Sequence, residues 1–343
     1  MPLPKRPAPA DTTFIPADPS EDPTERFLAE VFAAVDAGDN ARVDELIEEA
    51  KAAQGPTCPT VRLIAELAKS GNKDRDSLRK RYEVLTDPIG FVPRGNPADH
   101  RAALLKGRPH LSAVIDTLLT DLAPREAIRL RPTIFVGTPG CGKTTLARSI
   151  GQQLGLPSVV YPAAGVADAT FGGTSAHWSN TAPAVPVQLL AQHRIANPLI
   201  IIDEVDKAPV GNHNGSLMDV LLGFLDRGNA SVFRDPSLES VVDCSHVNWI
   251  LTANETGSIP GPLKDRCRII KVPDPEWRHV HDICRSILDS IAEERDLDRR
   301  WLPDLDQDEI DLIGKHWRGG SIRKLHRIVE TIIDVRDRHL PSA

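Results

Sequence analysis

The sequence predicts an α/β fold: a P-loop parallel sheet with helices on both faces, followed by a helical lid, plus a small all-α N-terminal domain. Three observations lead to this prediction. A glycine-rich stretch at residues 137–144 lies between an apolar run and a helical segment, four aliphatic residues at 199–202 end in Asp203, and strand signals vanish beyond Pro273. Strands that alternate with helical segments are typical of a parallel sheet.

The predicted organisation has five parts along the 343 residues. Residues 1–23 are rich in proline and are expected to form a disordered tail, and residues 24–86 form a helical N-terminal domain. Residues 87–99 are a linker. Residues 100–273 form the P-loop core, and residues 274–343 form the helical lid. The length is sufficient for about two domains.

Apolar residues at helical spacing predict four helices in the N-terminal domain. The first extends from Phe27 to Gly38, and Val43–Ala50 mark the second. Val61–Ala68 suggest a third helix that ends near Gly71, and Leu78–Leu85 suggest a fourth. These apolar stripes form the core of the domain itself or, alternatively, dock a partner or substrate.

Core and lid carry separate patterns of strands and helices. Aliphatic runs predict four strands, at Ile134–Val136, Ser158–Val160, Leu199–Ile202 and Val247–Leu251. Helical spacing predicts a segment before the first strand and two helices after Pro273, at Leu104–Leu118, Val280–Ile291 and Ile322–Ile332. Continuous aliphatic runs are expected for strands that are buried on both faces.

Composition narrows the class of protein. The formal net charge of −7 at pH 7 argues against non-specific coating of nucleic acid. The five cysteines are odd in number and lack Cys-x-x-Cys spacing, so neither a disulfide framework nor a zinc site is indicated. No apolar segment approaches the roughly 18 residues needed to span a bilayer, and the chain begins without an apolar signal core. We therefore expect a soluble, cytoplasmic protein without membrane contact.

The glycine-rich stretch fits Gly-x-x-x-x-Gly-Lys-[Ser/Thr], the motif that binds the phosphates of a nucleoside triphosphate. Its backbone N–H groups and the start of the following helix provide positive potential for the phosphates. Lys143 is expected to reach the β- and γ-phosphates, and the Thr144 hydroxyl to ligate Mg²⁺. The alternative is a chance glycine turn. The residues expected to bind ATP are Gly137, Thr138, Pro139, Gly140, Cys141, Gly142, Lys143, Thr144 and Thr145. Cys141 fills space in the loop or, alternatively, is sensitive to oxidation.

The second chemical signal is the Asp-Glu pair that follows the third predicted strand. Asp203 is expected at the carboxyl end of this strand, where open α/β sheets place their ligands. Its carboxylate can hold Mg²⁺ through water, while Glu204 polarises the attacking water molecule as general base. An Asp-Glu pair alone would more often be a solvated strand end. Together with the glycine loop, it predicts hydrolysis of the triphosphate.

With these two segments the chain resembles an AAA+ ATPase, and roughly residues 100–340 are similar to the ATPase module of Lon proteases. Leu251–Glu255 resembles the sensor-1 strand, which implies that Asn254 orients the attacking water. Residues 206–226 also follow the Lon pattern after its Asp-Glu pair.

Two further segments of the resemblance carry arginines. Ile259–Arg266 resembles the segment that ends in the arginine finger, which implies that Arg266 acts on the triphosphate of a neighbouring subunit. Gly320–Leu325 resembles the sensor-2 helix, which implies that Arg323 faces the nucleotide. Alternatively, Arg266 forms a surface ion pair with Asp265, and Arg323 is one basic residue of an amphipathic helix. A finger that acts in trans implies a ring, a homohexamer by family analogy.

The resemblance also implies a substrate-gripping pore loop. Trp178 falls at the aromatic position of this loop, but Ser179 replaces the aliphatic neighbour. An exposed indole in a loop rich in small residues favours a contact role. The alternative is that Trp178 packs against its own domain.

Lon proteases continue after the lid into a peptidase domain, whereas this sequence ends at Ala343, so no intrinsic proteolysis is expected. The resemblance implies a ring ATPase that remodels or unfolds a protein substrate and delivers it to a separate protease or effector.

Two alternative functions stay open. One is a nucleic-acid motor or loader, against which the absence of Lys and Arg from residues 165–179 counts. The other is a regulatory switch whose ATP-bound state recruits partners.

Overall fold

The computed structural model describes residues 31–35, 37, 39, 41–43, 45–46, 59–69, 71–123, 125–164, 169–177, 181–209 and 216–339. The chain divides into two compact units, Met1–Thr57 and Cys58–Ala343. The predicted disordered tail at residues 1–23 lies outside the described residues.

In the first unit, residues 31–35, 41–43 and 45–46 are helical. This agrees with the helices predicted around Val31 and Val43. Ala34 and Leu46 are buried, so each segment contributes apolar side chains to the interior of its unit. The other residues that marked these two helices, Phe27, Leu28, Ile47 and Ala50, lie outside the described residues.

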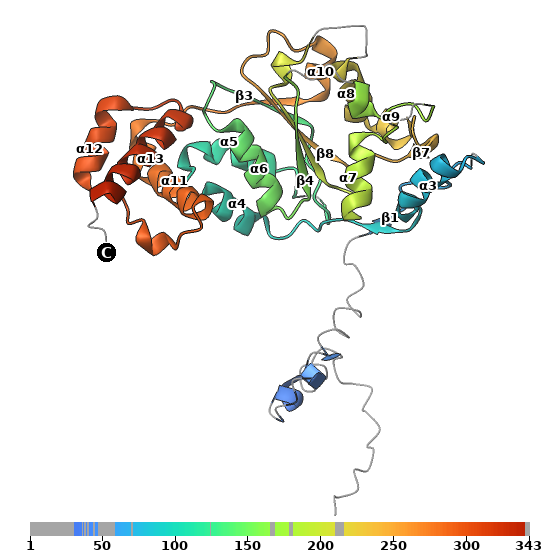
Figure 1. Ribbon diagram of the computed structural model, residues 1–343, viewed down its shortest axis with the longest axis horizontal. Coiled ribbons are helices and arrows are strands. Elements are labelled where there is room, and N and C mark those ends of the chain that lie inside the picture. Colours follow the sequence, from blue (N-terminus) through green and yellow to red (C-terminus); the bar gives the residue numbers. More distant parts are fainter. Residues whose placement is uncertain are drawn as a thin grey trace, which may run out of the picture. The chain divides into compact units, whose positions relative to one another are not determined.

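A five-stranded parallel sheet lies at the centre of the second unit (Figure 1), in the order β4-β5-β8-β3-β9. Its strands are β3 (Thr133–Val136), β4 (Ser158–Pro162), β5 (Leu199–Asp203), β8 (Asn248–Ala253) and β9 (Arg268–Lys271). The predicted α/β class is confirmed, and four of these strands coincide with predicted ones. β9 was not predicted, because its short apolar pair is flanked by Arg268 and Lys271 at the edge of the sheet.

Helices cover both faces of the sheet, as predicted. Leu199 and Ile201 of β5 belong to one apolar cluster, which includes α4, α5 and α6, whereas Ile200 and Ile202 belong to a second cluster with α7 and α8. This alternation follows from the two-residue period of a strand. The helices extend over Pro97–Leu105 (α4), Ser112–Leu119 (α5), Lys143–Gln153 (α6), Val185–His193 (α7) and Leu217–Leu225 (α8).

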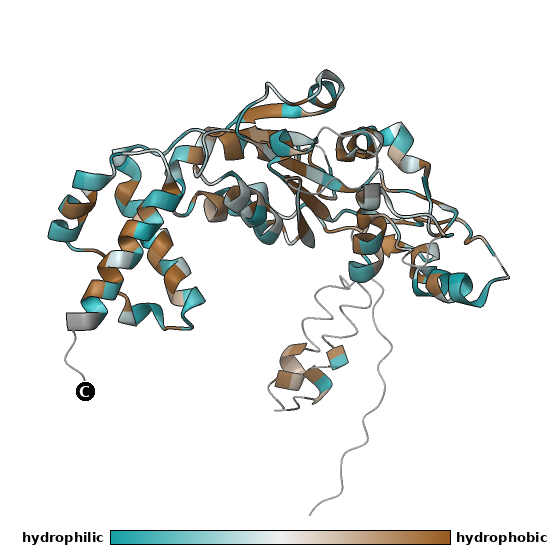
Figure 2. Cartoon of the chain, turned by 45° about the horizontal axis from the view of Figure 1, so that its top comes forward, coloured by the Kyte–Doolittle hydropathy of each residue, from teal (hydrophilic) through white to brown (hydrophobic). Residues whose placement is uncertain are grey.

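The lid follows the last strand and has its own apolar core. Its helices are α11 (Val280–Glu294), α12 (Gln307–His316) and α13 (Ile322–His339), preceded by the short helix η5 (Trp277–His279). α11 and α13 were predicted and α12 was not. Figure 2 shows that the lid helices carry both apolar and hydrophilic residues, as amphipathic helices do. Gly314 in α12 lies under the Trp277 ring, where an added Cβ would come within 3.0 Å of the indole.

Residues 59–86 differ from the predicted helical hairpins. The helix predicted from Val61 to Gly71 is wrong: β1 (Thr60–Val61) pairs antiparallel with β2 (Ile89–Gly90), and an irregular segment follows. Leu63 and Ile64 donate backbone hydrogen bonds to the carbonyl of Leu85 instead of to a helix. Tertiary contacts therefore override the helical spacing of these residues. The fourth predicted helix is confirmed as α3 (Lys73–Arg81), which begins after the N-cap Asn72 and continues into η1 (Glu83–Thr86).

Residues 59–86 also share the core of the sheet. Leu63, Ile64, Leu78 and Leu85 belong to the same apolar cluster as Ile200 and Ile202. The division between compact units falls after Thr57, not at residue 86. The domain limits inside the second unit, at residues 87, 100 and 274, stay predictions.

The second unit also contains smaller elements. A hairpin of β6 (Phe233–Asp235) and β7 (Ser240–Val242) follows the short helix α9 (Arg227–Ser231), and α10 (Gly261–Arg266) precedes β9. None of the helices in the described part of the chain combines the length and the apolar character needed to cross a bilayer.

Candidate active site

The glycine loop connects β3 to α6 in the conformation that its sequence requires. Gly140 and Gly142 have φ angles of +84° and +95°, which side chains with a Cβ rarely adopt. A Cβ on Gly140 would also lie 2.4 Å from Ser321 Oγ of the lid. α6 begins at Lys143, so the free N–H groups of its first turn face the same loop.

Lys143 is buried at the base of this loop. Its ammonium donates hydrogen bonds to the carbonyls of Gly137 (2.9 Å) and Thr138 (3.0 Å) and to Asn254 Oδ1 (3.0 Å). In the described residues it has no carboxylate partner, although a buried charge normally needs one. The cavity above this ammonium therefore attracts an anion.

The Asp203 carboxylate lies beside the start of α6. The hydroxyls of Thr144 and Thr252 each donate to Asp203 Oδ1 at 2.6 Å. The Thr252 hydroxyl also accepts a hydrogen bond from the backbone N–H of Glu204 at 2.9 Å. Thr144 and Asp203 thus bring together a hydroxyl and a carboxylate, the oxygen ligands that Mg²⁺ prefers. These donors fit the predicted metal.

Thr252 was missed by the sequence reasoning. It is fully buried in β8, two residues before Asn254, and its side chain connects the Asp-Glu pair to the neighbouring strand. A threonine inside an apolar strand is an ordinary β-former, so its type alone gives no signal.

Glu204 follows β5 with a left-handed backbone (φ +54°) and is partly exposed. Its Oε1 accepts a hydrogen bond from Lys207 Nζ at 2.7 Å. This hydrogen bond is the main reason why the pKa of Lys207 is raised. Asn254 lies opposite, where its backbone N–H donates to Asp206 Oδ2 at 3.0 Å.

A cavity of about 420 Å³ lies between this group and the lid. Its volume falls within the range of about 300–1,000 Å³ that is usual for small-molecule sites. The lid is docked on the loop, because the Ile322 N–H donates to the carbonyl of Gly140 at 2.8 Å. The predicted site residues that line the cavity are Pro139, Gly140, Gly142, Lys143, Thr144, Thr145, Asp203, Glu204, Asn254 and Arg323.

The other predicted site residues lie around or outside this cavity. The backbone carbonyls of Gly137 and Thr138 accept hydrogen bonds from the Lys143 ammonium, and the Thr138 hydroxyl donates to Asp274 Oδ1. Cys141 is fully buried, and burial raises the pKa of its thiol, which favours the space-filling role over oxidation.

Arg266 does not line the cavity. Its side chain is exposed at the end of α10 and donates to the Pro262 carbonyl at 3.0 Å. In the described residues it forms no ion pair with Asp265 or with another carboxylate. Its guanidinium is therefore available to another molecule.

A second cavity of about 700 Å³ adjoins the first and shares Gly142, Thr145, Ile322 and His326 with it. His110 lies in its wall with both ring nitrogens buried, and within the described residues neither nitrogen has a hydrogen-bond partner. Burial, with smaller contributions from His279 and Arg108, lowers the pKa of His110 to about 4, so the ring is neutral near pH 7. The sequence reasoning did not identify His110.

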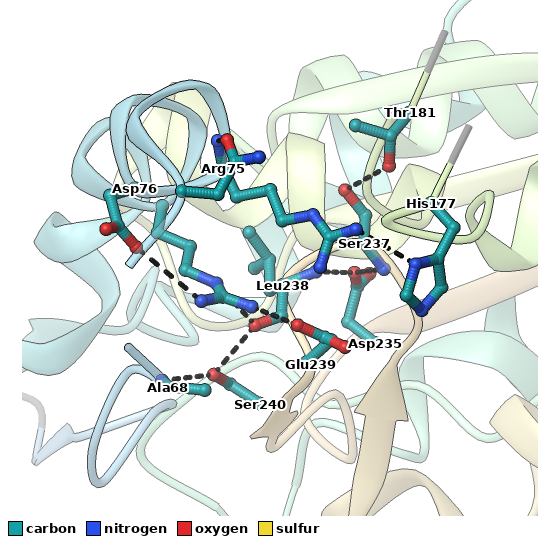
Figure 3. A network of polar contacts seen from close by, with 12 residues as sticks. Ala68, Arg75, Asp76, His177, Thr181, Asp235, Ser237, Leu238, Glu239 and Ser240 are labelled. Atoms are coloured by element: carbon teal, nitrogen blue, oxygen red, sulfur yellow. Dashed lines mark hydrogen bonds and ion pairs between the residues drawn. The ribbon is translucent and has the colours of Figure 1, made fainter. Parts of the chain in front are cut away.

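Trp178 of the predicted pore loop lies outside the described residues. Its flanks are anchored to other elements, as Figure 3 shows. Arg75 of α3 donates to His177 Nδ1 at 2.9 Å, and Thr181 donates to Ser237 Oγ at 3.0 Å. The role of Trp178 stays a prediction, as do the individual roles of the other site residues.

Comparison with known proteins bears on the family. Residues 133–274 match the family described as "ATPase family associated with various cellular activities (AAA)". The Lon protease of Mesomycoplasma hyopneumoniae is 30% identical over 243 residues, which cover 68% of this chain and 28% of that protein. The mitochondrial Lon protease homologue of Candida albicans is 27% identical over 325 residues, which cover 92% of this chain and 30% of the homologue.

One solved structure is also similar to the chain. It is the Thermotoga maritima RuvB Holliday junction branch migration motor, with a TM-score of 0.45 and 16% identity, covering 67% of this chain and 63% of that one.

The chain spans less than a third of the length of the two Lon relatives. The glycine loop, the Asp-Glu pair and the sensor asparagine all lie inside the matched range. The chain therefore carries an ATPase domain of the AAA family, similar to the ATPase module of Lon proteases.

Proposed function

We propose that this protein is a Lon-like AAA+ ATPase that binds and hydrolyses MgATP as a ring of identical subunits, a homohexamer, and remodels or unfolds protein substrates. The observation that carries the proposal is the convergence of Lys143, Asp203, Glu204 and Asn254 on one cavity between core and lid. A cationic loop, hard oxygen ligands and a carboxylate base in one place are what phosphoryl transfer to water requires.

Each of these residues has a role in the proposed reaction. Lys143 exchanges its hydrogen bonds to the loop carbonyls and to Asn254 Oδ1 for bonds to phosphate oxygens, and the released Asn254 Oδ1 then orients water. Thr144 and Asp203 hold Mg²⁺, which neutralises charge on the phosphates when it is bound. Glu204 accepts a proton from the attacking water.

The second cavity suits the nucleoside end of the ligand. It shares the lining residues Gly142, Thr145, Ile322 and His326 with the first cavity, so we propose that one ligand extends from one cavity into the other. The ring nitrogens of His110, which have no partner in the described part of the chain, offer a donor and an acceptor in a neutral ring. In this pose the triphosphate lies on the loop and the base lies between core and lid.

Assembly into a ring is proposed from Arg266. Its guanidinium is exposed, outside the cavity of its own chain and without a carboxylate partner in the described residues. An arginine from a neighbouring subunit stabilises charge on the terminal phosphate and makes hydrolysis depend on assembly.

A polypeptide is the proposed substrate, with Trp178 as its contact in the pore, and a separate protease or effector as the recipient. The absence of Lys and Arg from residues 165–179 makes nucleic acid a weaker candidate. A cytoplasmic location belongs to the same proposal.

Mixing two inactive variants tests the shared site. Glu204→Gln removes the base but keeps Arg266, whereas Arg266→Ala keeps an intact cradle. Each variant alone should hydrolyse ATP at least about 100-fold more slowly than the unmodified protein. An equimolar mixture should regain activity, because mixed rings contain sites with an intact cradle and an intact arginine. Arg300→Ala, at an exposed lid arginine paired with Asp298, is the control and should keep full activity.

Two results would contradict the proposal. One is near-normal hydrolysis by Glu204→Gln. The other is a monomeric protein whose specific activity does not depend on its concentration. Copurification of polypeptides with ATP-bound Glu204→Gln would support the substrate class, whereas salt-sensitive stimulation of hydrolysis by DNA would point to a nucleic-acid motor.

A further inference from the structure

The one-turn helix η4 (Val205–Lys207) lies directly after the Asp-Glu pair. Its backbone closes on Glu204, since the Lys207 N–H donates to the Glu204 carbonyl at 2.9 Å. The same turn brings the Lys207 ammonium onto Glu204 Oε1 at 2.7 Å. A side chain three residues away thus holds the proposed general base.

Glu204 needs such a restraint. Its left-handed backbone (φ +54°) is uncommon for a residue with a side chain. The backbone is fixed from the other side by the Thr252 hydroxyl, which accepts the Glu204 N–H. The carboxylate itself has one described partner, Lys207. Its other oxygen, Oε2, has no hydrogen-bond partner in the described residues and is left for water.

The turn is also tied to the sensor strand. Asp206 Oδ2 accepts the backbone N–H of Asn254 at 3.0 Å, and the Asp206 carbonyl accepts from Ser258 Oγ at 3.0 Å. Among the described residues Asp206 Oδ1 is buried without a hydrogen-bond partner, and the bond from the Asn254 N–H to Oδ2 is the contact that holds this carboxylate. One turn therefore contacts both residues that are proposed to act on the attacking water.

The exposure of the Lys207–Glu204 pair decides what it can do. The Lys207 and Glu204 side chains are 51% and 42% exposed, and exposed ion pairs contribute little to folding stability. An effect of the pair should therefore appear in the rate of the reaction rather than in the stability of the protein.

We propose that Lys207 is a positioning residue that holds Glu204 Oε1 and thereby presents Oε2 to the attacking water, while Asp206 keeps the turn in register with Asn254. This inference rests on the proposed role of Glu204 as general base. Lys207 does not line the nucleotide cavity, so it acts through Glu204 and not on the nucleotide.

Substitution at Lys207 tests the inference through kcat and KM. Lys207→Met keeps the length of the side chain and removes the ammonium. We expect kcat for ATP hydrolysis to fall about tenfold while KM stays within about twofold, because a misplaced base affects the chemical step and not binding. Lys207→Arg retains a cationic donor and should restore most of kcat. Lys80→Met, at an exposed lysine of α3, is the matched control and should leave kcat unchanged.

A double-mutant cycle separates this inference from the assignment of the base. If Lys207 acts through Glu204, then adding Lys207→Met to Glu204→Gln should cause no further loss. Additive losses would overturn the inference, as would an unchanged kcat in Lys207→Met or a KM that rises in proportion to the loss. Full activity in Glu204→Gln would instead overturn the proposed base, whatever Lys207→Met does.

Discussion

The two walls of the nucleotide cavity are held in different ways. On the core wall, Lys143, Asp203 and Thr252 are connected by hydrogen bonds to neighbouring backbone and side-chain groups. On the lid wall, Arg323 and Arg327 line the same cavity but are exposed, and in the described part of the chain neither guanidinium has a carboxylate partner. Buried polar groups must be paired, whereas exposed ones are satisfied by water. The core wall is thus built in advance, and we propose that a bound nucleotide completes the lid wall.

The largest expected effect is on the core wall. Lys143→Met removes the buried ammonium, and the affinity for ATP measured by calorimetry should fall at least about 100-fold, which corresponds to about 2.7 kcal/mol. Without ATP, the melting temperature should change little, because the loss of the hydrogen bonds to Gly137, Thr138 and Asn254 is offset by removal of a buried charge that has no carboxylate partner in the described residues. A large loss of stability without ATP would mean that Lys143 is a structural residue.

The next effect tests how the core wall is held. Thr252→Val keeps the shape of the side chain but removes the hydroxyl between Asp203 Oδ1 and the Glu204 N–H. The free energy of unfolding in urea should fall by about 1–3 kcal/mol, because the part-buried Glu204 N–H loses its acceptor and Asp203 Oδ1 loses a donor. Thr252→Ser keeps the hydroxyl, so its free energy of unfolding should fall clearly less than that of Thr252→Val. Equal losses in the two variants would assign the effect to packing and not to the hydrogen bonds.

A smaller effect is expected on the lid wall. Arg323→Met should lower the rate of ATP hydrolysis about tenfold, or about 1.4 kcal/mol, while the stability of the nucleotide-free protein stays within about 0.5 kcal/mol. The physical reason is that an exposed, unpaired arginine contributes to the lid only when phosphate is present. A marked loss of stability without nucleotide would remove the contrast between the two walls.

The smallest expected effect is a change in stability at Gly223, a residue that belongs to neither wall of the cavity. Gly223 lies inside α8, and a Cβ added there meets nothing within 4 Å. Gly223→Ala should stabilise the protein by about 0.5–1 kcal/mol, because alanine loses less backbone entropy in a helix. Hydrolysis should be unchanged. Destabilisation measured by urea unfolding would indicate that α8 is not a regular helix at this position.

Much of the fold was predictable because its signals are local. The aliphatic run of β5 and the glycine loop are contiguous in sequence, and such patterns respond to backbone geometry within a few residues. The apolar spacing from Val61 to Ala68 misled the prediction, because it arises from contacts with distant segments. Asp243 N–H, for example, donates to the Leu63 carbonyl, and Ala68 N–H donates to Ser240 Oγ.

The residues of the candidate site likewise fall into those that local sequence motifs predicted and those that they did not. Lys143, Asp203 and Asn254 were predicted from motifs, and they line one cavity. Thr252 and His110 were not, because a buried threonine in a strand and a histidine after a proline are common in any protein. Only their unpaired or bridging atoms in the folded chain distinguish them.

By itself, the sequence determined that this chain carries a phosphate-binding loop, a strand that ends in an Asp-Glu pair and a helical lid, since each depends on neighbouring residues. The tertiary structure alone decided that residues 59–69 pack against the sheet core without forming a helix, that Thr252 bridges Asp203 and Glu204, and that Arg266 lies outside its own nucleotide cavity. These features depend on residues far apart in the chain, and only packing of the strands and helices brings such residues within hydrogen-bond distance or keeps them apart.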